Sequence, residues 1–413
     1  MQETPKASRL HIAIFGRRNA GKSSLINALT NQDIALVSSI PGTTTDPVYK
    51  AMEILPIGPV MIIDTAGIDD VGELGELRIE RTRQVLNKAD LAIVVLDAEV
   101  GLAEEEKTLI SDINKRNMPI VAVVNKSDLI SAKTSVLDKW ESELGIKILA
   151  VSAKEKFGLE ELKGSIIKAA PTDWEGPPII GDLISEGDAV VLVVPVDSAA
   201  PKGRLILPQV QTIRDIIDKD AYSIVAKETQ LKQALKDLAK PPKLVVTDSQ
   251  AFAGVSADTP EDVLLTSFSI LFARHKGDLE TFVMGAKAIA ALRPGDKVLI
   301  AEACTHHRQE DDIGQVKIPR WLNKAVGGQL EYEWYSGGGF PSGLSSYKMI
   351  IHCGACMITR REMLYRLSVA RQQDVPIVNY GVLIAYLHGI LDRALAPFPK
   401  LKQIIQGPET YES

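Results

Sequence analysis

Five short apolar runs alternate with amphipathic stretches between Leu10 and about Ala170, and this alternation constrains the fold more than any other feature. The runs are HIAIFG (11–16), VMIIDTAG (60–67), LAIVVLDAE (91–99), IVAVVNKSD (120–128) and IKILAVSAK (146–154). Successive positions in each run are apolar, as in parallel strands covered on both faces, and parallel strands are joined by crossover helices. We therefore predict an α/β domain with a parallel sheet over residues 8–170.

The Pro- and Gly-rich stretch PTDWEGPPIIGD (171–182) predicts a domain junction. A chain of 413 residues is long enough for two or three domains, each with its own core. Strand-like and helix-like stretches alternate again after the junction, and we predict two smaller α/β domains with largely parallel sheets, at 180–262 and 267–405. The domain at 180–262 carries no catalytic cluster. It is therefore either a self-association module, which would make the protein a homodimer, or a plain structural domain.

Composition limits the classes of partner. The formal charge of −6 and the pI of about 5.7 provide no global field that attracts nucleic acid. No apolar run approaches the roughly 18–20 residues that span a bilayer, and the start MQETPKASRL lacks the apolar segment of a signal peptide. We expect a cytoplasmic protein without a nucleic-acid or membrane partner. Its three cysteines cannot form a closed disulfide framework and are free for metal chemistry.

Residues 16–23, GRRNAGKS, match the phosphate-binding pattern G-x-x-x-x-G-K-[ST], between a strand-like and a helix-like run. The two glycines let backbone N–H groups face phosphate oxygens, the lysine supplies charge to the β- and γ-phosphates, and the serine hydroxyl binds Mg²⁺. The nucleotide-binding residues predicted here are Gly16, Asn19, Ala20, Gly21, Lys22, Ser23 and Ser24.

Three further clusters follow strand-like runs, at the edge where open α/β sheets bind ligands. Asp64 can hold Mg²⁺ through water, and Gly67 can approach the γ-phosphate. In the second cluster, Asp128 can accept from both the ring N–H and the exocyclic amine of guanine, a pair of donors that adenine lacks. The remaining residues expected at the base are Asn125, Lys126, Ser152, Ala153 and Lys154.

In this order the motifs resemble the Ras-like GTPase superfamily, and GRRNAGKS, PGTTTD (41–46) and DTAGI (64–68) most resemble its tRNA-modification-GTPase and Era-like branch. The resemblance implies hydrolysis of GTP to GDP with Mg²⁺, carried by Lys22, Thr44, Asp64 and Gly67. Ile68 stands where other members place a water-orienting glutamine. The resemblance further implies that Asn19 helps hold a K⁺ ion that replaces an arginine finger. Glu73 and Glu76 either position water or belong to a solvated acidic loop.

All three cysteines fall in two clusters, Cys304-x-His306 and His352-Cys353-x-x-Cys356, each after a strand-like run. If those strands are parallel neighbours, both clusters emerge at the same sheet edge. The Gly-rich stretch SGGGFPSG (336–343) lies between them. Three interpretations remain open from the residues alone: small buried hydrophobes, a structural Cys₃His zinc site, and an iron–sulfur cluster with one open iron position.

The spacing C-x-H with a distant H-C-x-x-C, on a chain with GTPase motifs, resembles the HydF family of FeFe-hydrogenase maturation factors. The resemblance implies that Cys304, Cys353 and Cys356 bind a 4Fe-4S cluster, with His306 and His352 as candidates for the open position or for contacts to a diiron precursor. His307 lies outside the motif.

The same resemblance implies a GTP-dependent scaffold that assembles the diiron subcluster or transfers it to apo FeFe-hydrogenase, with the radical-SAM maturases HydE and HydG as further partners. Two alternatives belong to other classes. One is an RNA- or ribosome-associated assembly GTPase with a structural zinc module, and the other is a GTPase with a regulatory iron–sulfur redox sensor.

Overall fold

The computed structural model describes residues 4–30, 47–68, 73–129, 134–195, 205–303, 312–337, 339–341 and 343–401, with backbone alone at 73–78 and 134–135. The chain divides into two compact units, Met1–Glu175 and Gly176–Ser413. The division lies within the Pro- and Gly-rich stretch 171–182. No helix in the described ranges combines the length and apolar character needed to cross a membrane.

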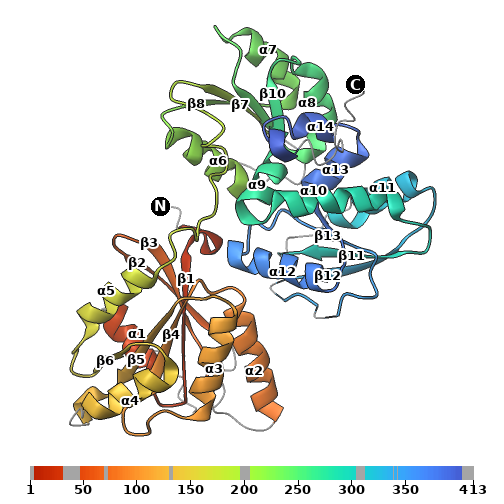
Figure 1. The fold of residues 1–413 in the computed structure, drawn as a ribbon. Coiled ribbons are helices and arrows are strands. Elements are labelled where there is room, and N and C mark those ends of the chain that lie inside the picture. Colours follow the sequence, from red (N-terminus) through yellow and green to blue (C-terminus); the bar gives the residue numbers. More distant parts are fainter. Residues whose placement is uncertain are drawn as a thin grey trace, which may run out of the picture. The chain divides into compact units, whose positions relative to one another are not determined.

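The first unit is built on a six-stranded sheet in the order β2-β3-β1-β4-β5-β6 (Figure 1). All pairings between described strands are parallel except that of β2 with β3, which is antiparallel. The parallel α/β prediction is therefore confirmed, with an antiparallel edge strand added. The elements are β1 Leu10–Gly16, α1 Lys22–Thr30, β2 Val48–Ile54, β3 Gly58–Asp64, α2 Glu73–Leu86, β4 Leu91–Asp97, α3 Glu104–Lys115, β5 Ile120–Asn125, α4 Thr134–Leu144, β6 Ile148–Ala150 and α5 Leu159–Ala169.

Alternate residues of β1 fill two separate cores. Ile12 and Ile14 belong to the apolar cluster that contains Leu25 of α1, whereas Ala13 and Phe15 belong to the cluster that contains Ile110 of α3. Successive side chains of a strand point to opposite faces, so a strand with helices on both sides must be apolar at every position. This is the physical reason for the unbroken apolar runs in the sequence.

The second unit contains two four-stranded sheets, β10-β9-β7-β8 and β12-β11-β13-β14, and every strand pairing in them is parallel. The first sheet and its helices comprise β7 Ala189–Val193, α6 Leu207–Ile217, β8 Tyr222–Ala226, α7 Leu231–Lys236, β9 Leu244–Thr247, α8 Phe252–Asp258, β10 Leu264–Ser267 and α9 Phe268–Lys276. The remaining elements are α10 Leu279–Lys287, β11 Lys297–Glu302, the π-helix Ile313–Lys317, α11 Ile318–Val326, β12 Glu331–Ser336, β13 Met349–His352, α12 Arg360–Gln372, β14 Ile377–Asn379, α13 Tyr380–Leu387 and α14 Leu391–Ala394.

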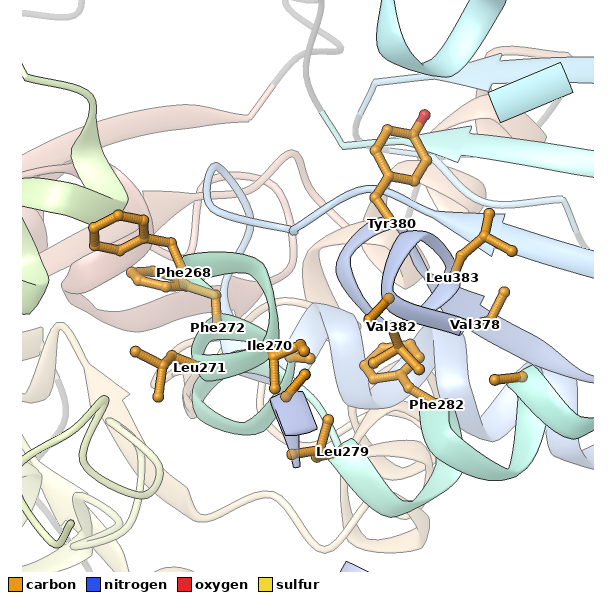
Figure 2. Close-up of a cluster of buried hydrophobic side chains, with 14 of the residues drawn as sticks. Phe268, Ile270, Leu271, Phe272, Leu279, Phe282, Val378, Tyr380, Val382 and Leu383 are labelled. Atoms are coloured by element: carbon orange, nitrogen blue, oxygen red, sulfur yellow. The ribbon is translucent and has the colours of Figure 1, made fainter. Parts of the chain in front are cut away.

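One continuous hydrophobic core serves both small sheets. Phe268, Leu271 and Phe272 of α9 belong to the same cluster as Phe282 of α10 and Leu383 of α13. Figure 2 shows the α9 side chains on one side of the view, Phe282 and Leu383 on the other, and Ile270 and Leu279 between them. Strand β10 extends the β7–β9 sheet to Ser267, beyond the predicted domain limit at 262, and α14 packs against β10. The two sheets are thus joined by a shared layer of helices. The apolar core continues through residues 262–267, so these residues do not separate two cores.

Side-chain caps begin four helices of this unit. Ser267, Asp278, Thr359 and Asn379 each accept a hydrogen bond from a backbone N–H in the first turn of α9, α10, α12 and α13, respectively. Such caps satisfy N–H groups that have no partner within the helix. Two of them, Thr359 and Asn379, begin helices that follow β13 and β14 and so fix the chain near the end of β13, the strand that precedes Cys353.

Candidate nucleotide and cluster sites

The phosphate loop connects the end of β1 to the first turn of α1 (Figure 1). Gly16 and Gly21 have φ values of 153° and 84°. A Cβ at Gly16 would collide with the Val95 carbonyl, and a Cβ at Gly21 would collide with the Asn125 side-chain amide. Glycine alone meets both the positive φ and the close approach, so the loop can curl around a phosphate at these positions.

Lys22 is buried and turned into the loop. Its Nζ donates to the carbonyls of Gly16 (2.9 Å) and Arg17 (2.8 Å). Arg17 Nε in turn donates to the fully buried Glu106 (2.5 Å) on α3. The protein itself therefore holds the lysine charge inside the phosphate loop, without a nucleotide.

Ser23 and Asp64 lie together as a magnesium site requires. Ser23 Oγ donates to Asp64 Oδ2 (2.8 Å), while Asp64 Oδ1 is buried and has no hydrogen-bond partner within the described residues. Burial raises the pKa of Asp64, against the lowering effects of the Ser23 hydrogen bond and the Lys22 charge. A buried carboxylate oxygen with an open acceptor position fits Mg²⁺, which prefers oxygen ligands. Thr44, the third predicted magnesium residue, lies outside the described residues.

The DTAG segment is fastened to the phosphate loop. Thr65 Oγ1 donates to the Ile14 carbonyl (2.6 Å), and the Ile68 N–H donates to the Gly16 carbonyl (3.4 Å). Gly67 is therefore held between two anchored residues beside the loop that would carry the γ-phosphate. Side chains of Glu73 and Glu76 lie outside the described set.

Asn125 connects the phosphate loop to the loop expected at the base. Its Nδ2 donates to the Ala20 carbonyl (2.9 Å), and its Oδ1 accepts from the Ala153 N–H (3.1 Å). The residue is 2% exposed, so neither bond competes with bulk water. One side chain thereby sets the separation between the phosphate end and the base end of the site.

Asp128 is the residue predicted to recognise the base, and its carboxylate is held by one neighbouring side chain. Ser152 Oγ donates to its Oδ1 (2.6 Å), and this hydrogen bond lowers the pKa of the exposed Asp128 carboxyl. An ionised carboxylate can accept two N–H groups from guanine, and Oδ2 remains on the other side of the carboxylate for that contact. Lys126 donates to Asp97 (2.7 Å), which fixes the neighbouring side chain.

The other sequence-predicted nucleotide residues take varied positions. Asn19 is exposed with a φ of 61°, Ser24 is exposed on α1, and Lys154 is exposed beside Glu155. Ala20 is buried and contributes its carbonyl to Asn125. These positions surround the phosphate and base ends, and their contacts with nucleotide stay predictions.

The two cysteine-bearing segments leave adjacent parallel strands. β11 pairs with β13, and Ala301 is the register partner of His352. The Cys353 N–H donates to the Ala301 carbonyl (2.9 Å), and the Ala303 N–H donates to Cys353 Sγ (3.1 Å). The expected strand neighbourhood is confirmed. Cys304 follows Ala303 in sequence, but Cys304, His306 and His307 lie outside the described residues.

His352 is fully buried at the end of β13, and both of its ring nitrogens have partners. Nδ1 lies 2.8 Å from the Cys353 carbonyl, and Nε2 lies 3.0 Å from Nη1 of Arg366 on α12. A carbonyl only accepts and a guanidinium only donates, so Nδ1 carries the proton and Nε2 accepts. Burial and the Arg366 charge lower the pKa of His352 to about 3.

Arg366 is fully buried, which sequence reasoning missed. Besides His352, its guanidinium donates to Glu362 (2.8 Å) and to the Gly337 carbonyl (3.1 Å), and it lies 5.3 Å from the centre of the Phe340 ring. Gly337 and Phe340 belong to the Gly-rich stretch 336–343. A single cation on α12 therefore ties that stretch to the end of β13.

The two described thiols lie in a largely desolvated environment that has charges of both signs nearby. Burial raises the pKa of Cys353, whereas the Arg366 charge acts in the opposite direction. Burial and the neighbouring Cys353 raise the pKa of Cys356 to about 11, and the charge of the buried Lys276 opposes that rise. Burial thus favours the protonated thiols, and the two cations offset only part of that effect.

Glu302 and Tyr380 form a second buried polar pair near the same edge. The Tyr380 hydroxyl donates to Glu302 Oε1 (3.2 Å), and the Gly337 N–H donates to the Glu302 carbonyl (2.9 Å). Burial, followed by the Glu302 charge, raises the pKa of Tyr380. A Cβ on Gly314 would collide with the Tyr380 hydroxyl, so the π-helix after residue 312 approaches this pair closely.

The sulfur donors at the end of β13 bear on whether a metal cluster fits this sheet edge. Among the described residues, no three His, Cys, Asp or Glu side chains converge as a metal site. Two thiols are nevertheless present at one strand end, one already accepts a backbone N–H, and the third cysteine adjoins the residue that donates it. Thiolate donors with N–H···S contacts suit an iron–sulfur cluster or zinc, so the chemistry fits a cluster held by three cysteines.

Comparisons with known proteins divide the chain in three. Residues 11–126 match the 50S ribosome-binding GTPase family, residues 179–277 match the hydrogen maturase F dimerization domain, and residues 280–397 match the hydrogen maturase F tetramerization domain. The two hydrogenase-maturase matches together take up more than half of the 413 residues.

Curated relatives align with the first unit. The tRNA modification GTPase MnmE of Syntrophomonas wolfei is 41% identical over 161 residues, which are 39% of this chain and 34% of that protein. GTPase Der of Kosmotoga olearia is 37% identical over 172 residues, 39% of each chain. The chain thus spans only about a third of the length of these relatives.

A solved structure of Era from Aquifex aeolicus bound to GDP and aluminium fluoride aligns with a TM-score of 0.36 at 22% identity, over 52% of this chain and 91% of that chain. This likeness is too weak to add to the domain matches. Two matches specific to one family, joined to a GTPase domain, agree with the motifs and with the sheet edge that carries the cysteines. The chain belongs to the hydrogen maturase F family, HydF, and its N-terminal domain is a P-loop GTPase domain that matches the 50S ribosome-binding GTPase family.

Proposed function

We propose that the protein hydrolyses GTP and serves as an iron–sulfur scaffold that assembles the diiron subcluster of the FeFe-hydrogenase H-cluster or transfers it to the apo-hydrogenase. The observation that carries the proposal is the parallel pairing of β11 with β13, which brings the residue before Cys304 against Cys353 Sγ. The matches to both maturase domains support the same assignment.

The GTPase part of the proposal rests on hydrogen bonds that connect the phosphate loop to the DTAG segment and to Asn125. Lys22 brings a positive charge to the phosphate loop, and Ser23 and Asp64 offer oxygen ligands. Gly67 is proposed to sense the γ-phosphate, and the hydrogen bond from the neighbouring Ile68 N–H to the Gly16 carbonyl supports this. When bound, Mg²⁺ neutralises charge on the β- and γ-phosphates. Ile68 cannot orient water, so slow intrinsic turnover follows, with Asn19 proposed to assist a K⁺ ion.

Cys304, Cys353 and Cys356 would hold the 4Fe-4S cluster in the second unit. When bound, a cluster with three cysteine ligands supplies one iron with an exchangeable position, which suits a carrier of a second iron unit. The charges of Arg366 near Cys353 and of Lys276 near Cys356 act in favour of the thiolates that a cluster requires, against the larger effect of burial. Apo-hydrogenase and the radical-SAM maturases HydE and HydG are the proposed partners, a homo-oligomer the proposed assembly, and the cytoplasm the proposed location.

Anaerobic purification with metal analysis and a visible spectrum tests the scaffold. We expect about four irons per chain, by the stoichiometry of the proposed cluster, and broad charge-transfer absorption. Cys304→Ala, Cys353→Ala and Cys356→Ala should each lose both, whereas His307→Ala serves as a matched control that keeps them. Stoichiometric zinc without visible absorption would refute the iron scaffold and favour an assembly GTPase with a zinc module.

A transfer assay separates a scaffold from a redox sensor. Protein incubated with HydE, HydG and their substrates should activate apo-hydrogenase after its re-isolation, and Cys353→Ala protein should not. A chain that holds iron and hydrolyses GTP but never activates the hydrogenase would instead be a GTPase with a regulatory cluster.

A further inference from the structure

Arg366 is a buried cation whose contact with His352 plays no part in the functions proposed so far. It is fully buried on α12, 14 residues after His352 in sequence, and its Nη1 lies 3.0 Å from His352 Nε2. Burial of a charge is costly unless hydrogen bonds and a counter-ion compensate it. Glu362, the Gly337 carbonyl and the imidazole supply that compensation, while Nε has no partner within the described residues.

The hydrogen bonds around His352 leave only one tautomer. Nδ1 must donate to the Cys353 carbonyl, so the lone pair lies on Nε2, and Arg366 Nη1 points a donor at it. A metal needs that same lone pair from a neutral histidine. The imidazole directly before Cys353 is therefore saturated by the protein, although His352 was a candidate ligand on sequence grounds.

We propose that Arg366 is a positioning residue that withholds His352 from iron and so keeps the fourth iron position of the cluster open for cargo. This inference rests on the proposed cluster. The same guanidinium holds the Gly337 carbonyl, so it also fixes the Gly-rich stretch beside the strand end. Losing Arg366 frees Nε2 and loosens that stretch in one step.

The contact itself is testable in the metal-free protein. ¹⁵N-histidine NMR should give His352 as the Nδ1–H tautomer with an unprotonated Nε2, assigned by loss of its signals in His352→Ala. An Nε2–H tautomer would overturn the proposal. This measurement does not depend on iron, so its failure is distinct from failure of the proposed function, which absence of iron from the anaerobic wild-type protein would indicate.

Pulsed EPR on the reduced, cluster-loaded full chain tests the consequence. Wild type and His352→Ala should show the same nitrogen couplings, because His352 is not a ligand. Arg366→Gln combined with Glu362→Gln, which avoids leaving an unpaired buried carboxylate, should gain a strong nitrogen coupling that a further His352→Ala change removes. Arg371→Gln is the matched control, since Arg371 lies on the same helix with a side chain 72% exposed.

Two results would overturn the idea. One is a strong wild-type nitrogen coupling that disappears in His352→Ala, which would make the histidine a resident ligand. The other is a folded, iron-loaded Arg366→Gln/Glu362→Gln protein with no new histidine coupling. Arg366→Lys keeps the positive charge but loses the planar guanidinium with its several N–H donors. It should gain a weaker nitrogen coupling than the Arg366→Gln/Glu362→Gln protein.

Discussion

Replacing Asn125 by alanine would separate the phosphate end of the nucleotide site from its base end. The change removes the hydrogen bond from Nδ2 to the Ala20 carbonyl (2.9 Å) and the one from the Ala153 N–H to Oδ1 (3.1 Å). Both lie around a side chain that is 2% exposed, so water does not readily replace them. If GTP or GDP binds both loops, as proposed, its binding would then have to order them itself.

The size of the effect follows from those two bonds. Each contributes about 1 kcal/mol net, and leaving buried groups unsatisfied adds to the cost, which gives about 2–3 kcal/mol in total. Since 1.4 kcal/mol corresponds to a tenfold change, we expect the GDP dissociation constant of Asn125→Ala to rise roughly 30- to 150-fold. The dissociation constant of Asn125→Asp should lie between those of wild type and Asn125→Ala. One carboxylate oxygen still accepts from the Ala153 N–H, whereas the other faces the Ala20 carbonyl and cannot donate to it.

Fluorescent GDP titration of the full chain measures this directly. Asn27→Ala is the matched control: Asn27 lies on α1 in the same unit and accepts one hydrogen bond from Lys50 (2.9 Å), away from both loops. It should change GDP affinity by no more than a few-fold. If Asn125→Ala, verified as folded by circular dichroism, binds GDP within threefold of wild type, then Asn125 does not couple the loops and the reasoning is wrong.

Three other predictions concern the same unit. Asp128→Asn should weaken GTP binding and improve relative binding of xanthosine nucleotides, because an amide N–H can face the xanthine oxygen, while iron content stays unchanged; competition binding and metal analysis check this. GTP turnover, followed by phosphate release, should be faster in K⁺ than in Na⁺ at equal ionic strength, and equal rates would remove the proposed K⁺ site at Asn19. Burial raises the folded-state pKa of Asp64, so its contribution is fully favourable below the unfolded value near 3.9 and is lost as pH rises through the folded pKa. In EDTA without nucleotide, Asp64→Asn should therefore raise the thermal midpoint of the first unit at pH 7 but not at pH 3.5, while abolishing GTP hydrolysis; an equal shift at both pH values would contradict the burial argument.

Much of the fold follows from the apolar pattern of the sequence. Runs such as LAIVVLDAE specify strands covered on both faces, and β4 is buried at every position. The antiparallel edge strand β2 was not foreseen, because VYKAMEI is only partly buried and its period is mixed. The shared core of the second unit was also missed, since apolar residues on α9, α10 and α13 do not reveal which sheet they face.

The candidate sites divide in the same way. Lys22, Ser23, Asp64 and Asn125 could be predicted because fixed spacing and a strand–loop–helix context define them. Arg366 could not, because α12 contains three other arginines in RREMLYRLSVARQ and no local pattern marks the buried one. Which arginine enters the core depends on the place of β13 and the Gly-rich stretch, and that is decided by tertiary contacts.

The single core of the second unit limits how its two sheets can be separated, in evolution or by protein engineering. The helices that follow the β7–β10 sheet supply apolar side chains to the β11–β14 sheet, and α14 returns to β10. Separating the two maturase domains would therefore expose apolar side chains of this shared core to water, with Phe268, Leu271 and Phe272 among them. A second subunit that binds either sheet would therefore bind the same folded body that carries Cys353.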